Sequence, residues 1–311
     1  MAEIRFDPIG RYSVVIAPER SKRPQDNITN KEKKSELCPF CPGNENQTPP
    51  ETYSNGNNVK KWTIRSIPNK YPAFSLLNNP QNSGVQEVIV ETDRHDINMG
   101  DFTYDHMVEL LKTYQHRLKE IKKNKDIKYI VVFKNHGLMA GATLTHQHSQ
   151  IVGLSFVPAE VELKLRNINN FAIENGKCFF CKIDREDVVY ENNSFKLISP
   201  KTARFAYECW IIPSHHQSHF EDISVEQIGD LAEIFLKHIK VINSQLNNPS
   251  FNVILNNGLY NQTQNEIYHW YIQVIPRTSL QAGFEWATGM FINQVEPEKV
   301  MHLFKNKLYN Y

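Results

Sequence analysis

The sequence lacks long apolar runs, a large net charge and an abundance of cysteine. No stretch of its 311 residues approaches the roughly 18 to 20 consecutive apolar residues of a membrane span. The first ten residues, MAEIRFDPIG, also lack the apolar core of a secretory signal. We therefore expect a soluble, cytoplasmic protein with no membrane partner.

The balance of charge argues against a protein that binds nucleic acid. The chain has 35 basic and 34 acidic residues, so its formal net charge is +1. Proteins that bind nucleic acid usually carry a broad basic surface, and this composition gives no sign of one. A small anionic ligand needs only a local basic pocket, so such a ligand remains compatible with the sequence.

Cysteine is scarce, but its spacing is informative. Four of the five cysteines form two CxxC pairs, Cys38 with Cys41 and Cys178 with Cys181. CxxC pairs that are followed by histidines are typical of metal sites and not of a disulfide framework. The fifth, Cys209, lies in the apolar run YECWIIP and is expected to be a buried structural thiol.

The order of features along the chain begins again at Cys178, which indicates an internal duplication. Each half has a CxxC pair, a histidine, an Asn-rich strand end with a glycine, and a final HxH or HxY strand. The markers are Cys38, Cys41, His95, Gly137, His146 and His148 in the first half and Cys178, Cys181, His216, Gly258, His269 and Tyr271 in the second. We predict two α+β halves, residues 1–170 and 171–311, with mostly antiparallel sheets. Their exposed sheet edges could pair into one larger sheet.

Periodicity predicts the individual elements. The strands expected in the first half cover Arg11 to Ile16, Trp62 to Ile67, Gln86 to Glu91, Tyr129 to Lys134 and Ile151 to Val157. Helices are predicted over Phe102 to Lys123, Glu160 to Asn175 and Val225 to Leu246. The polar run NITNKEKKSE is predicted to be a mobile surface loop.

The stretch THQHSQ carries the strongest chemical signal. His146 and His148 alternate with Gln147 on an extended run, so they point to one face. If the strand end twists, one ring can face a metal and the other a bound phosphate. A neutral histidine whose second ring nitrogen is held by a carbonyl can attack phosphorus, which predicts a covalent intermediate and ping-pong kinetics. Gln150 could then stabilise the developing charge with its amide.

Other residues near this stretch suit a metal and a phosphate. Zinc requires four ligands, and the nearest set is Cys38, Cys41, His95 and His146. The remaining first-half histidines are expected elsewhere, His106 and His116 on the solvent face of a helix and His136 in a turn. The small residues Gly141, Ala142 and Thr143 suit a close approach of the backbone to a phosphate.

Several longer segments resemble the galactose-1-phosphate uridylyltransferase family, a branch of the histidine-triad superfamily. The resemblance runs through nearly the whole length. The segments are DPIGRYSVVIAPERSKRP, CPFCPGNENQTPPE, RSIPNKYPAF, VIVETDRH, NHGLMAGATLTHQHSQ and GFEWATGMFINQVEPE.

The resemblance implies roles for individual residues. It makes His148 the nucleophile, Gln150 its partner, and Cys38, Cys41, His95 and His146 zinc ligands. Nucleotide and phosphate contacts are expected from Asn69, Lys70, Asn135, Gly141 and Thr143, with Arg11, Arg20 and Arg23 as further candidates to neutralise phosphates. Phe284 and Glu285 are the sugar candidates, and the resemblance implies that they act across a homodimer interface.

The chain also departs from the pattern of the best-known members. Its HQHSQ replaces their HPHGQ, which resembles plant and archaeal relatives, among them an ADP-glucose phosphorylase. Cys178, Cys181, His216 and His269 resemble a second zinc set, although the neighbouring His215 and His219 compete for the third position. Tyr271 replaces the second nucleophile, and a phenol cannot do this work at neutral pH, so the second half is expected to have lost catalysis.

Three functions follow as hypotheses. The first is a uridylyltransferase that exchanges UDP-glucose and galactose 1-phosphate for UDP-galactose and glucose 1-phosphate through a uridylyl-histidine. The second is an ADP-glucose phosphorylase or related adenylyltransferase with inorganic phosphate as acceptor. The third, from another class, is a noncatalytic nucleotide-binding protein stabilised by zinc. In all three the partners are small molecules.

Overall fold

The structure is a computed structural model that describes residues 3–16, 38–56, 61–76, 83–260 and 267–308. The predicted loop NITNKEKKSE and the candidates Arg20 and Arg23 lie outside these residues. None of the helices in the described segments has the length and apolarity that crossing a bilayer would require.

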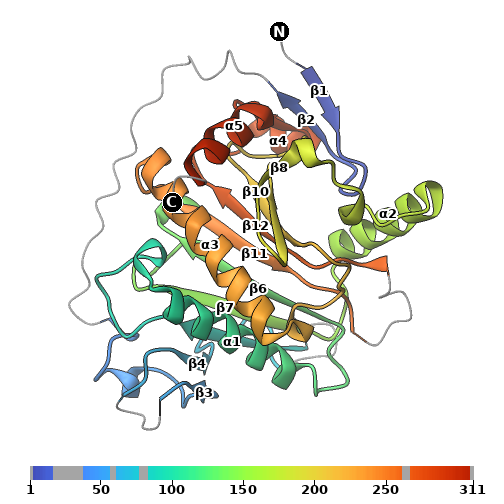
Figure 1. Ribbon diagram of the computed structural model, residues 1–311. Helices are drawn as coiled ribbons and strands as arrows, with labels where there is room; N and C mark the ends of the chain where they lie inside the picture. The colour runs from blue at the N-terminus through green and yellow to red at the C-terminus, as the bar shows by residue number, and fades with distance from the viewer. Residues whose placement is uncertain (1–2, 17–37, 57–60, 77–82, 261–266, 309–311) are drawn as a thin grey trace.

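One large antiparallel sheet organises the chain (Figure 1). Its ten strands run in the order β3-β4-β5-β7-β6-β11-β12-β10-β9-β8. Their bounds are β3 Tyr53–Ser54, β4 Arg65–Pro68, β5 Gly84–Val90, β6 Tyr129–His136, β7 His148–Leu154, β8 Val188–Glu191, β9 Phe195–Ile198, β10 Cys209–Pro213, β11 Phe251–Asn256 and β12 Tyr271–Pro276. The predicted α+β class with mostly antiparallel strands is confirmed.

The two halves meet where β6 pairs with β11. The register runs antiparallel from Phe251 opposite His136 to Leu255 opposite Val132. Because this pairing uses one strand from each half, it merges two smaller sheets and removes two exposed edges. The expected joining of the sheet edges is confirmed.

A second, three-stranded sheet covers one end of the molecule. It contains β1 (Glu3–Phe6), β2 (Ser13–Ile16) and β13 (Phe291–Asn293), with β13 parallel to β2. Figure 1 shows the β1–β2 hairpin at the opposite end of the molecule from β3 and β4.

Helices α1 (Tyr104–Ile121) and α3 (Val225–Leu246) lie side by side across one face of the large sheet (Figure 1). The remaining helices are α2 (Ala159–Asn175), α4 (Gly283–Thr288) and α5 (Pro297–Leu308). The side chain of Thr103 caps α1, and Ser224 with Gln227 forms a capping box at the start of α3. These caps explain why both helices begin close to the predicted positions.

Side-chain alternation on β5 separates two apolar clusters. Ile89 belongs to the main core, which contains the buried face of α1. Its neighbours Val88 and Val90 point the other way and pack with Cys38 and Phe40 in a smaller cluster. The first CxxC pair therefore lies on the face of the sheet opposite α1 and α3.

Three histidine predictions were wrong in detail. His106 and His116 are half-buried and not solvent-facing, because the Nε2 of His106 bonds the carbonyl of Glu91 at 2.7 Å and His116 packs on Tyr53. His136 does not lie in a turn. It ends β6 and stacks on Phe251, with ring centroids 4.6 Å apart.

His238 lies on α3 in the main core, and its environment makes stability depend on pH. It is fully buried, neither ring nitrogen has a hydrogen-bond partner among the described residues, and its ring packs edge-on against Phe304. Burial lowers the pKa of His238 from 6.5 to about 3. Below pH 6.5 the imidazole of His238 binds a proton in the unfolded chain, but in the folded chain it stays neutral until about pH 3. The folded state therefore loses stability relative to the unfolded state as the pH falls from 6.5 towards 3.

We expect the free energy of unfolding to fall by about 2 kcal/mol between neutral pH and pH 5 because of His238 alone. His238→Leu should remove this part of the pH dependence, and denaturant titrations at the two pH values measure it. His302→Leu, at an exposed position on α5, is the control and should keep the wild-type slope. Equal slopes in wild type and His238→Leu would contradict the prediction.

Candidate active site

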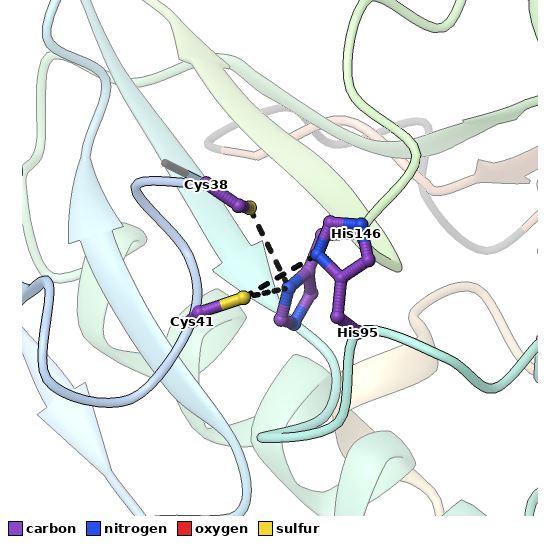
Figure 2. Close-up of side chains that lie close together, drawn as sticks. All are labelled: Cys38, Cys41, His95 and His146. Carbon is purple, nitrogen blue, oxygen red and sulfur yellow. Dashed lines mark hydrogen bonds between the residues drawn. The ribbon is translucent and has the colours of Figure 1, made fainter. Parts of the chain in front are cut away.

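Two cysteines and two histidines converge beside the start of β7 (Figure 2). Cys38 and Cys41 come from the segment before β3, His95 follows β5, and His146 precedes β7. Their four ligand atoms all lie within 4.8 Å of one another. The Nδ1 of His146 is 3.7 Å from Cys38 Sγ and 3.5 Å from Cys41 Sγ, and the Nδ1 of His95 is 3.3 Å from Cys41 Sγ.

These separations fit a tetrahedral metal ion. Metal–ligand bonds of about 2.0 to 2.3 Å place neighbouring ligand atoms roughly 3.3 to 3.8 Å apart. The outer nitrogens of both rings are also held, His146 Nε2 by the Thr92 carbonyl at 2.7 Å and His95 Nε2 by the Thr145 hydroxyl at 3.1 Å. Burial and the neighbouring Cys38 raise the pKa of Cys41 to about 11, so the thiolate form of Cys41 is disfavoured. A bound cation would stabilise that thiolate.

The second half holds a cluster of the same composition. Cys178, Cys181, His216 and His269 lie within the same 4.8 Å limit. Cys181 Sγ is 3.5 Å from His216 Nδ1 and 3.7 Å from His269 Nδ1. His219, which competed for the third position, instead bonds the Leu259 carbonyl at 3.1 Å. Within the part of the chain that the structure describes, the outer nitrogen Nε2 of His269 is buried without a hydrogen-bond partner, whereas the Nε2 of His146 bonds the Thr92 carbonyl.

His148 lies beside the first cluster, on the same face of the sheet as Phe40. β7 begins at His148, so His146 precedes the strand, and the Phe40 ring lies near both histidines, with centroids 6.2 Å from His146 and 5.3 Å from His148. The Nδ1 of His148 donates to the His146 carbonyl at 2.8 Å. Since a carbonyl only accepts, this bond places the proton on Nδ1 and leaves Nε2 with a free lone pair. Burial lowers the pKa of His148 below its ordinary value.

His148 lines a cavity of about 460 Å³ on the face of the sheet opposite α1. Apolar and polar side chains share the walls, which is typical of a small-molecule site. The lining residues are Pro39, Phe40, Gln47, Thr48, Pro49, Ile67, Pro68, Asn69, Lys70, Tyr71, Val88, Thr143, Leu144, His148 and Gln150.

Gln150 and Gly141 have the local geometry that phosphate binding would need. The Oε1 of Gln150 accepts from Gln86 at 3.1 Å, so its N–H groups are the donors that it can offer to a ligand. Gly141 has a φ of 83°, in the left-handed region that favours glycine. This turn brings Thr143 to the wall of the cavity.

Of the other residues predicted to contact the ligand, some line the His148 cavity and others do not. Asn69 and Lys70 line the cavity, although Lys70 Nζ donates to the Gln47 carbonyl at 3.2 Å. Asn135 lines a different cavity on the same sheet face. Arg11 is exposed on the β1–β2 hairpin and is not among the lining residues.

The sugar candidates Phe284 and Glu285 are also absent from the walls of the His148 cavity. They lie on α4, where Phe284 is 45% exposed and Glu285 accepts the backbone N–H of Ala282. Their position within one chain is compatible with a contact to another copy and does not complete this chain's own cavity.

A buried ion pair beneath His148 was missed from the sequence. Lys134 Nζ donates to Glu91 Oε2 and to the His148 carbonyl at 3.2 Å. Tyr114 donates to the other oxygen of Glu91 at 2.9 Å. The sequence did show a charged residue at the end of each of two apolar runs, Glu91 in VIVET and Lys134 in IVVFKN, which could have indicated this pair. Phe40, whose ring lies 5.3 Å from that of His148, was equally visible between the first two cysteines.

The second half repeats the pattern HxHxQ as HxYxQ. Tyr271 is buried, and its hydroxyl accepts from Lys164 at 3.1 Å. The repeated glutamine is Gln273, which donates to Glu208 at 3.1 Å and accepts from Asn256 at 3.0 Å. Internal partners therefore occupy the side-chain polar groups of Tyr271 and Gln273.

Comparisons with known proteins agree with this geometry. Residues 89–311 match the family model described as a domain of unknown function, DUF4921, and residues 19–157 match the DUF4931 N-terminal domain. The chain is 32% identical to ADP-glucose phosphorylase from Arabidopsis thaliana over 97% of this chain and 92% of that protein. It belongs to the galactose-1-phosphate uridylyltransferase family, with features of the ADP-glucose phosphorylase-like branch.

A second relative and one solved structure are also informative. Galactose-1-phosphate uridylyltransferase from Thermotoga maritima is 26% identical over 96% of both chains. The crystal structure of the Arabidopsis thaliana ADP-glucose phosphorylase with bound ADP-glucose superimposes on this structure with a TM-score of 0.90. The match covers 98% of this chain and 99% of the phosphorylase chain. Both named activities transfer a nucleotidyl group, so the chain is a nucleotidyltransferase homologue.

The two clusters predict independent metal binding. Cys38→Ser and Cys178→Ser should each remove about one equivalent of metal, because each deletes one of four ligands, and should lower the melting temperature. Metal analysis by mass spectrometry and thermal unfolding measure both effects.

Cys209→Ser is the matched control, since Cys209 is buried but belongs to neither cluster. It should lose stability without losing metal. Full metal content and wild-type stability in Cys38→Ser would contradict the first site.

Proposed function

We propose that this protein is a nucleotidyltransferase that transfers a nucleoside monophosphate from a nucleoside diphosphate sugar to a phosphate acceptor through His148. The observation that carries the proposal is the 2.8 Å hydrogen bond from His148 Nδ1 to the His146 carbonyl, beside a cavity of nucleotide size. It supports a neutral imidazole whose Nε2 is available to attack phosphorus.

The first half-reaction forms a covalent intermediate. His148 Nε2 attacks the α-phosphorus, the bond from that phosphorus to the bridging oxygen breaks, and the sugar 1-phosphate leaves with the bonding pair. The His146 carbonyl continues to accept from Nδ1 as positive charge develops on the ring. The amide of Gln150 would donate to a nonbridging oxygen of the α-phosphate.

The second half-reaction reverses these steps with a new acceptor. A phosphate oxygen attacks the α-phosphorus, the bond from phosphorus to Nε2 breaks, and His148 returns to its neutral form. Asn69, Lys70, Gly141 and Thr143 are the proposed nucleotide and phosphate contacts, because they line the cavity or shape its wall.

Two donors are candidates, each favoured by one observation. Adenine nucleotide sugar with inorganic phosphate is favoured by the 32% identity and the TM-score of 0.90 to the relative named ADP-glucose phosphorylase. UDP-glucose with galactose 1-phosphate is favoured by the full-length similarity to the Thermotoga maritima uridylyltransferase. Both donors use the same nucleophile.

The metal clusters have a supporting role in this proposal. Zinc suits both sets, since two thiolates and two imidazoles form a closed tetrahedral site with no position open for substrate. In the first half, residues 1–170, the ion would fix the backbone of His146 and hence the carbonyl that orients His148. In the second half, residues 171–311, it would hold a noncatalytic repeat.

A homodimer would complete the site from outside. Phe284 and Glu285 would contact the sugar of a second copy, which accounts for the exposure of Phe284. Arg11 and Arg20 are proposed to neutralise phosphates of the substrates.

The nucleophile is tested by substitution. His148→Asn should abolish transfer, by at least about a thousandfold, because no other neutral imidazole lines the cavity in the described chain. Metal content and melting temperature should stay within error. Intact-mass measurement after incubation with donor should show a nucleotidyl adduct in wild type only. His302→Asn, on exposed α5, should behave as wild type, and an active His148→Asn protein would remove the nucleophile.

The donor is tested by parallel incubations with UDP-glucose and ADP-glucose, followed by discharge with galactose 1-phosphate or inorganic phosphate. A uridylyl adduct discharged by the sugar phosphate identifies the uridylyltransferase. An adenylyl adduct discharged by phosphate identifies the phosphorylase. No adduct from either donor would favour a noncatalytic nucleotide-binding protein.

A further inference from the structure

A second cavity lies on the same sheet face as His148 and contains two arginines. Its volume is about 350 Å³. The floor comes from β6 and β11, and Arg204 and Arg277 close one side. The lining residues are Val131, Phe133, Asn135, Arg204, Phe205, Asn252, Ile254, Ile275 and Arg277.

Strand register makes this cavity the neighbour of the His148 cavity. Phe133, in its floor, is paired across β6 and β7 with Gln150, which lines the His148 cavity. Asn135 and Asn252 are paired across β6 and β11, and Asn252 donates to Asn135 at 2.9 Å. Adjacent strands are about 4.8 Å apart, so a ligand over β6 and β11 lies roughly 5 to 10 Å from β7.

The two guanidiniums have hydrogen-bonding capacity that the chain leaves unused. The Nε atoms of Arg204 and Arg277 are both buried and have no hydrogen-bond partner among the described residues. Buried donors are almost always satisfied, and these two Nε atoms lie out of reach of water, so the contacts of either arginine with a ligand in the cavity would come from its terminal guanidinium nitrogens.

Neither guanidinium is neutralised by an ion pair within the described residues. Glu208 is the carboxylate with the largest electrostatic effect on Arg204. Its oxygens accept hydrogen bonds from Trp210 Nε1, from Gln273 Nε2 and from the backbone N–H groups of residues 204 and 205. Burial lowers the pKa of Arg277, and the positive charge of Arg204 acts in the same direction. The carboxylates of Glu208 and Asp7 raise the pKa of Arg204 and so stabilise its charge, whereas Arg277 is the arginine of this cavity whose charge is destabilised by burial and by Arg204.

We infer that this cavity binds the phosphoryl group of the acceptor, with Arg277 as its principal ligand and Asn135, whose oxygen accepts from Asn252, as a further donor through its amide N–H groups. Arginine offers paired donors that match phosphate oxygens, and the position beside Gln150 places the anion next to the proposed phosphorus centre. Inorganic phosphate and a sugar 1-phosphate share this chemistry. The inference rests on the proposed nucleotidyl transfer for its purpose, although not for the binding itself.

The first test measures binding without catalysis. Equilibrium dialysis with radiolabelled inorganic phosphate compares wild type, Arg277→Met, Arg277→Lys and the control Arg166→Met, which removes an exposed arginine of α2. We expect saturable binding in wild type and in the control, about tenfold or more weaker binding in Arg277→Met, and partial rescue in Arg277→Lys. Arg277 is chosen because Arg204 packs on Tyr12 and Phe291 and supports the fold.

The second test follows both half-reactions. In Arg277→Met, formation and discharge of the adduct on His148 should each slow about tenfold or more at subsaturating donor and acceptor and recover at high concentration, because the incoming phosphate takes the place of the leaving sugar 1-phosphate. Discharge of the adduct by inorganic phosphate and by galactose 1-phosphate is measured in separate experiments. The compound whose discharge rate falls in Arg277→Met is identified as the acceptor.

Absence of saturable phosphate binding in wild type, or equal binding in wild type and Arg277→Met, would overturn the inference. If Arg277→Met fails to fold, as judged by its melting curve, Arg277→Lys carries the test, and equal affinity to wild type would count against it. Failure of the proposed function has a different signature, which is no adduct in wild type from either donor. Phosphate binding in dialysis would still respond to Arg277 in that case.

Discussion

The hydrogen bond from His148 Nδ1 to the His146 carbonyl is the interaction on which the site depends. It selects the tautomer of His148, and its geometry requires that the backbone at His146 stay fixed. The ring of His146 joins the cysteines of the first cluster and is held from behind by Thr92. From the opposite side, Lys134 bonds the His148 carbonyl. A metal cluster and a buried ion pair thus hold the same short piece of chain.

The two halves share this plan but use it differently. Both place a Cys2His2 cluster beside a final strand, and both keep a glutamine two residues after the second position of the motif. In the second half, Tyr271 and Gln273 are engaged by Lys164 and Glu208. The His148 cavity remains open because the small side chains of the Gly141 turn and the apolar wall around Phe40 leave space. The sheet that joins β6 to β11 lets the second half contribute to the surface beside His148.

Local charge on that surface contrasts with the neutral chain as a whole. A net charge of +1 conceals a cavity in which Arg204 and Arg277 have no ion-pair partner among the described residues. Below the sheet, the opposite holds, since Lys134 and Glu91 are buried together and neutralise each other. Burial strengthens both effects, because charges interact more strongly where water is excluded. The two faces of one sheet therefore separate structural charge from charge available to a ligand.

The sequence by itself determined the α+β class, the main helices and the members of both clusters, because CxxC spacing, helical periodicity and capping residues are local signals. Thr103 and Ser224 set the starts of α1 and α3 in this way. Only the tertiary structure decided which strands meet, that the Nδ1 of His148 bonds the His146 carbonyl, and that Asn135 belongs to a different cavity from Asn69. It also brought Arg204 and Arg277 into a cavity that adjoins the His148 cavity across β6 and β7. These arrangements depend on pairing between distant strands, and no local pattern in a single sequence encodes that register.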